Sequence, residues 1–134
     1  MKKTIFVAII GISFFISQNI YGYDEERAIS NLAGDFAECS AYYIIAAEAF
    51  RRTTKEDLAQ KALEASDIAY VYAIKFSNPK VAAATTRSAF DKQRKEMDHD
   101  FSNFSILILK YEEMCRDALE SPEKRLEYWL KKND

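Results

Sequence analysis

The chain has 134 residues, 49% of them hydrophobic and 30% charged, which is enough for one domain and too few for two. Its 19 basic and 21 acidic side chains are mixed along the sequence, so it lacks the clustered positive charge of a nucleic-acid-binding surface. Only three glycines and two prolines occur, and strand-type runs with turn dipeptides are absent. We therefore expect an almost entirely helical protein.

The sequence begins with the layout of a secretory signal peptide. Lys2 and Lys3 precede an apolar run from Ile5 to Ile16, and Gly22 offers a small residue for cleavage. The run is shorter than the roughly 20 residues that a membrane-spanning helix needs. We predict a signal peptide over residues 1–22, export to a bacterial periplasm, and a single helical domain over residues 23–134 with no stable membrane span. An uncleaved N-terminal anchor is the alternative.

The first helix of this domain is predicted from about Asp24 to Arg52. Its apolar residues recur at alternating steps of three and four, which is typical of a helix that packs against a neighbour. Asp35 and Glu38 flank this stripe, and Glu38 is the best candidate for a functional acid, with ordinary solvation as the alternative. The stripe consists of Ile29, Leu32, Phe36, Cys39, Tyr43, Ala46 and Phe50.

A second helix is predicted from the sequence TTKED to about Ser77. Thr53 or Thr54 is expected to cap it, because an acidic residue follows three positions later, as in a capping box. At its end, Asn78 is expected to cap a third helix whose first residue is Pro79. The apolar stripe of the second helix consists of Leu58, Ala62, Ala65, Ala69, Tyr72 and Phe76.

After Pro79 the apolar spacing continues to Cys115 without a break, which by itself favours one very long helix. In that helix Cys115 would lie about 54 Å beyond Pro79, whereas Cys39 lies only ~21 Å into the first helix. A turn within residues 98–103 instead brings Cys115 level with Cys39. Because exported proteins usually pair their cysteines, we favour the turn and predict a Cys39–Cys115 disulfide. The continuous stripe consists of Ala83, Arg87, Phe90, Arg94, Met97, Phe101, Phe104, Ile108, Tyr111 and Cys115.

A short last helix is predicted from the cap Ser121 and from Pro122 at its first position. Leu126, Trp129 and Leu130 share one of its faces. The predicted fold is therefore all-α: an up-down-up-down four-helix bundle with a short C-terminal fifth helix, held by the disulfide.

Few residues could support catalysis or a cofactor. His99 is the only histidine, and its neighbours Asp98 and Asp100 point in different directions on a helix, so we expect an exposed polar turn rather than a metal site. The sequence contains no C-x-x-C-H motif and no glycine-rich phosphate loop. We predict no catalytic residues, no metal and no cofactor. A b-type haem held by His99 with Met97 or Met114 is the alternative.

Aromatic residues exceed what a minimal bundle needs. Tyr42, Tyr70 and Tyr128 lie off the main apolar stripes, and Trp129 follows the last of them. Tyrosine and tryptophan are enriched at binding hot spots, so we predict that these four residues bind a partner, with the outer wall of the core as the alternative. The resulting hypothesis is a chaperone-like or inhibitor-like, non-enzymatic protein that binds another protein or peptide. A small-molecule or haem carrier that uses the bundle interior is the alternative function.

Overall fold

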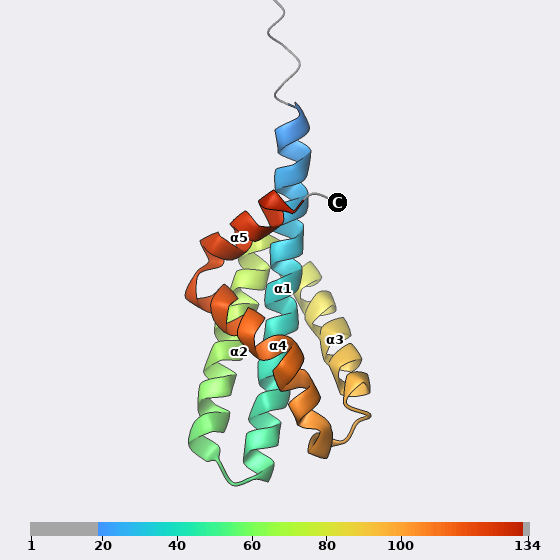
Figure 1. The fold of residues 1–134 in the computed structure, drawn as a ribbon, viewed down its shortest axis with the longest axis vertical. Coiled ribbons are helices and arrows are strands. Elements are labelled where there is room, and N and C mark those ends of the chain that lie inside the picture. The colour runs from blue at the N-terminus through green and yellow to red at the C-terminus, as the bar shows by residue number, and fades with distance from the viewer. Residues whose placement is uncertain (1–18, 133–134) are drawn as a thin grey trace, which may run out of the picture.

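The computed structural model describes residues 19–132, and these form five α-helices and one short 3-10 helix (Figure 1). No strand occurs among the described residues, so the all-α prediction is confirmed. Most of the predicted signal peptide lies outside this range. The helices are α1 (Asn19–Arg52), α2 (Glu56–Phe76), α3 (Pro79–Glu96), α4 (Phe104–Glu120) and α5 (Pro122–Lys131), with the 3-10 helix η1 (Phe101–Asn103) before α4.

Helix α1 lies at the centre of the fold and contacts each of the other four α-helices. In Figure 1, α2 and α3 lie on either side of it, α4 crosses its front, and α5 crosses near its upper part. Because α1 is covered from several directions, its buried residues extend around the helix beyond the single predicted stripe. Buried residues in its middle include Phe36, Ala37, Cys39, Ser40, Ala41 and Tyr42.

Helix α4 is attached to α1 covalently. Cys39 of α1 and Cys115 of α4 form a disulfide with their Cα atoms 5.3 Å apart, and both residues are fully buried. The predicted pairing is confirmed. Around it, Tyr42 of α1 packs against Phe104 and Tyr111 of α4, with ring centroids 6.1 and 6.0 Å away.

The turn predicted within residues 98–103 is also confirmed, and its mechanism is a pair of left-handed residues. Asp98 and His99 have φ angles of 54° and 56°, a region that Asp and His enter more readily than most residues other than glycine. The Asp100 carboxylate then accepts a hydrogen bond from the backbone N–H of Ser102 at 2.9 Å, opening η1. The chain therefore reverses without a glycine or proline.

The predicted threonine cap of α2 is wrong. Helix α2 begins after Lys55 and has no side-chain cap at its N-terminus. The Thr53 hydroxyl instead donates to the Phe50 carbonyl at 3.1 Å, and Thr54 has a φ of 60°. These threonines therefore end α1 rather than start α2. The caps predicted for the next boundaries are confirmed at Asn78 and at Ser121.

The face of α3 that packs against α1 differs from the face predicted from the continuous apolar stripe. Ala82, Ala89 and Gln93 are buried, whereas Ala83 and Arg87 of the predicted stripe are exposed. The Gln93 side-chain amide donates to the Glu38 carbonyl of α1 at 2.9 Å. Small side chains and one buried glutamine thus form this interface. Among the described residues, no helix is both long and apolar enough to span a membrane.

Candidate interaction surface

An apolar groove of about 310 Å³ lies between α2 and α4, with α1 as its floor. We call it the α2–α4 groove. Lys61 and Glu112 are its charged residues, and the rest of its lining is aliphatic or aromatic. The lining consists of Tyr42, Tyr43, Ala46 and Phe50 from α1, Leu58, Lys61 and Ala62 from α2, and Phe104, Ile108 and Glu112 from α4.

The groove arises because α2 and α4 pack against α1 through side chains of different size. The buried residues of α2 are four alanines and Ser66, whose hydroxyl donates to the Ser40 carbonyl of α1 at 2.9 Å. Such small residues let α2 lie close to α1. Helix α4 instead packs on α1 through aromatic rings, including Phe104 and Tyr111 against Tyr42. These unequal packings leave an open strip between the two helices.

The walls of the groove expose aliphatic side chains to solvent. Leu58 on α2 and Ile108 on α4 are each 41% exposed. Two further aliphatic residues of α4 are exposed outside the groove lining, Ile106 at 45% and Leu109 at 89%. Exposed aliphatic side chains that gather around a groove are a feature of many interaction sites.

The floor of the groove carries no charge, and the one carboxylate of the lining, Glu112 of α4, is hydrogen-bonded to it. The Tyr42 hydroxyl donates to Glu112 at 2.7 Å. Burial and this carboxylate raise the pKa of Tyr42 far above its usual range, and burial followed by the charge of Glu112 raises the pKa of Tyr43 to about 12. Both hydroxyls are therefore protonated at neutral pH, and the Tyr42 hydroxyl holds one oxygen of Glu112 against the floor.

The four aromatic residues predicted to bind a partner do not form one surface. Tyr42 is only 2% exposed and lies in the core, as the outer-wall alternative expects. Tyr70 is partly buried against the same core. Tyr128 and Trp129 lie together on α5, with ring centroids 5.1 Å apart, and Tyr128 is 45% exposed.

Part of the role of Trp129 is structural. Its indole N–H donates to the Asp35 carboxylate of α1 at 2.7 Å, and the Arg125 guanidinium donates to the same oxygen at 2.6 Å. Asp35 is only 8% exposed, so this charge is buried and satisfied from α5. Glu38, the candidate functional acid, pairs with Lys92 of α3 at 3.0 Å. Asp35 thus links α1 to α5, and Glu38 links α1 to α3.

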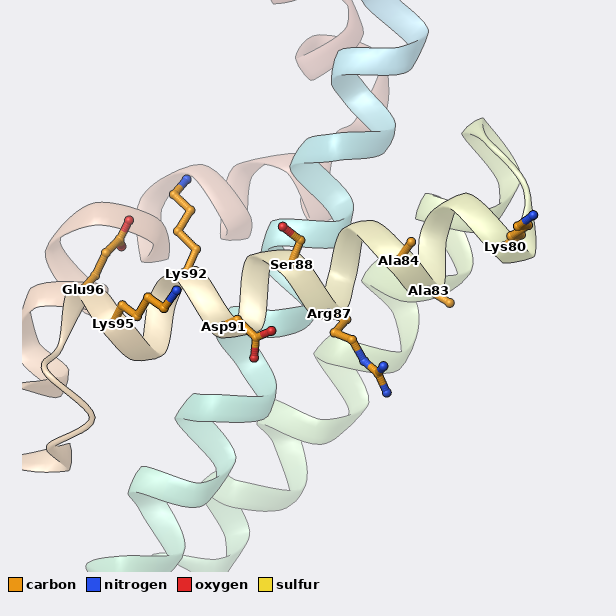
Figure 2. Close-up of a pocket in the computed structure, with 9 residues that line it drawn as sticks. All are labelled: Lys80, Ala83, Ala84, Arg87, Ser88, Asp91, Lys92, Lys95 and Glu96. Carbon is orange, nitrogen blue, oxygen red and sulfur yellow. The ribbon is translucent and has the colours of Figure 1, made fainter.

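The outward face of α3 forms a wider hollow of about 1220 Å³ (Figure 2). Its charges are mixed: Lys92 pairs with Glu38 of α1, Glu96 pairs with Lys110 of α4, and Asp91 lies among the remaining basic residues. Figure 2 shows Asp91 and Arg87 on one side of the helix and Lys92 on the other. The lining consists of Lys80, Ala83, Ala84, Arg87, Ser88, Asp91, Lys92, Lys95 and Glu96.

His99 is exposed in its turn, as predicted, and lines none of the four cavities described for residues 19–132. Within that range, no group of three or more His, Cys, Asp or Glu residues is placed to hold a metal ion. The carrier hypothesis remains an untested prediction.

The groove residues Leu58, Tyr43, Phe50 and Ile108 were interpreted from the sequence as ordinary core positions. For α4 alone the sequence does carry a signal, because four consecutive aliphatic residues, 106–109, cannot all be buried by a helix that is packed on one side. Comparison with known proteins offers no further guide, since no family model, curated protein or solved structure matches the chain.

Proposed function

We propose that this chain is a small exported, non-enzymatic interaction protein that binds an apolar segment of another protein or peptide in the α2–α4 groove. The observation that carries this proposal is the combination of an apolar groove with exposed aliphatic walls, Leu58 and Ile108. Removing these side chains from water is the driving force for binding, and burial of one such side chain supplies about 1.5–3 kcal/mol.

The dimensions of the groove favour an extended or helical segment with one or two large apolar side chains. Its volume of about 310 Å³ is near the lower end of the range for ligand sites. Walls from two helices with an apolar floor suit the helix-in-groove mode of recognition, in which residues on one face of a helix act as anchors. Lys61 on one wall provides a polar contact at the rim.

Export and the bundle topology belong to the same proposal. A buried disulfide, Cys39–Cys115, is typical of proteins that fold in an oxidising compartment. The signal-like sequence of residues 1–22 also supports export.

We also infer that α1 to α4 form an up-down-up-down bundle, which is supported by the disulfide between the first and fourth of these helices.

Photo-crosslinking in the producing cell tests the proposal. A photoreactive amino acid replaces Leu58 in one variant and Ile108 in another, so that the probes lie on opposite walls of the groove. Val71 of α2, 63% exposed and outside the groove lining, is the matched control position. We expect both groove positions to capture the same molecule and Val71 to capture none. Equal capture at Val71, or capture only from a probe at Tyr128, would show that the groove is not the binding surface.

A further inference from the structure

We propose that the occupant of the α2–α4 groove is the exposed apolar ridge of α4 from a second copy of this chain. This inference rests on the proposed function, because it names an occupant for the same groove. We define the α4 ridge as Ile106, Leu109 and Glu113. Leu109 has the largest exposed fraction, 89%, of the large hydrophobic residues described.

The ridge residues of α4 alternate along the helix with the residues that line the groove, so the ridge and the groove lie at the same height. Phe104, Ile108 and Glu112 of α4 line the groove, and Leu109 lies within this stretch of the helix. A two-fold axis beside α4 and parallel to it would therefore keep Leu109 at the height of the groove of the partner copy. Such an interface is isologous, because each copy inserts its ridge into the groove of the other, and it closes as a dimer.

The charges beside the two apolar elements are complementary. Lys61 lies on the α2 wall of the groove, and Glu113 follows Leu109 by one helical turn on the ridge. Neither residue takes part in an ion pair among the described residues. The same two-fold axis would bring Glu113 of each copy towards Lys61 of the other, giving an apolar centre with a charged rim, as interfaces generally have.

The dimer and the complex with another protein would exclude each other, since both occupy the groove. A partner segment would then have to displace Leu109 of the second copy. The strength of self-association would set how much of the protein is available for binding at a given concentration.

The test is sedimentation equilibrium of the purified protein over a range of concentrations. Leu109→Glu should weaken dimerisation about 10–100-fold, because a buried leucine is replaced by a charge. Val71→Glu, at another exposed aliphatic position of the described surface, should leave it unchanged. Lys61→Glu and Glu113→Lys should each weaken it by about two- to fivefold, and the double charge reversal should restore it.

The outcomes separate this inference from the proposed function. A dimer that Leu109→Glu dissociates and Val71→Glu does not, with rescue by the double reversal, supports the inference. A dimer that Leu109→Glu leaves intact overturns it. A protein that stays monomeric at every concentration, with a probe at Ile108 capturing a different protein, overturns the inference and supports the proposed function. A monomer with no capture at Ile108 or Leu58 overturns both.

Discussion

Replacing Asp35 by asparagine should release α5 from the rest of the protein. One oxygen of the Asp35 carboxylate accepts hydrogen bonds from the Arg125 guanidinium at 2.6 Å and the Trp129 indole at 2.7 Å. No residue of α5 is fully buried, and its apolar packing against the core comes from the partly buried Leu126 and Trp129, so these two hydrogen bonds add to a small apolar contact. Asparagine keeps the shape of the side chain and removes its charge.

The expected loss follows from the two hydrogen bonds. A hydrogen bond to a charged group contributes about 1.5–3 kcal/mol and a neutral one about 0.5–1.5 kcal/mol, so the amide oxygen of asparagine would hold both donors more weakly. The Arg125 side chain is 21% exposed and can partly rehydrate, which lowers the cost of leaving its charge unpaired. We therefore expect Asp35→Asn to weaken the docking of α5 by roughly 2 kcal/mol.

Trp129 provides the assay, because it is the only tryptophan in the chain and lies on α5. Urea unfolding is followed by its fluorescence and by the far-ultraviolet circular dichroism of all helices. In Asp35→Asn the fluorescence transition should precede the dichroism transition, whereas in the unmodified protein the two should coincide. Glu127→Gln removes the exposed pair with Lys131, 3.6 Å long, and should change stability by less than about 0.5 kcal/mol. If Asp35→Asn behaves like Glu127→Gln, the buried carboxylate does not hold α5.

Three further predictions follow from the packing of α1. The double variant C39A/C115A should lose up to about 4.5 kcal/mol in urea unfolding, because the disulfide spans 76 residues, and an unchanged midpoint would contradict this. Gly34→Ala should raise the free energy of unfolding by about 0.5–1 kcal/mol, because the residue is inside a helix and an added Cβ would meet nothing within 4 Å. Thermal unfolding tests this, and a lower melting temperature in the variant would contradict it. Burial, with Glu112, raises the pKa of Tyr42 and Tyr43 above the ordinary 10.0. The folded state therefore holds these two protons more tightly than the unfolded state, so the free energy of unfolding is highest below pH 10 and falls as the pH rises from 10 to 12. Absorbance of tyrosinate at 295 nm and loss of helical circular dichroism should appear together. Full tyrosinate absorbance in a protein that is still folded would contradict this prediction.

The helices and the disulfide could be predicted because local signals and geometry agreed. Asn78 with Pro79 marked one helix boundary, and the level of Cys39 required a turn before Cys115. The turn itself contains no glycine or proline, so the left-handed conformation of Asp98 and His99 could not be predicted from local sequence. The capping pattern at Thr53 gave a wrong prediction, because the Thr53 hydroxyl bonds to the last turn of α1 and does not cap α2.

The proposed interaction surface could not be predicted on α1 and α2, because the spacing of apolar residues shows which face of a helix is apolar but not which helix packs against that face. Leu58 and Ile108 have the spacing of core residues, yet α2 and α4 lie apart and leave both half-exposed. Tyr42 lies off the predicted stripe, yet it is buried because α1 is covered from several directions. Which apolar residues remain in solvent depends on the size of the side chains at each helix contact, which only the assembled fold shows.

Chemical-shift mapping with the segment captured at Ile108 tests the central claim most directly. The isotopically labelled protein is titrated with that segment as a synthetic peptide, and the backbone amides are followed. We expect the largest shifts at Tyr43, Leu58 and Ile108, with no change at Arg87 on the outward face of α3. Shifts concentrated on α3 or at Tyr128 of α5, with the groove unaffected, would contradict the account.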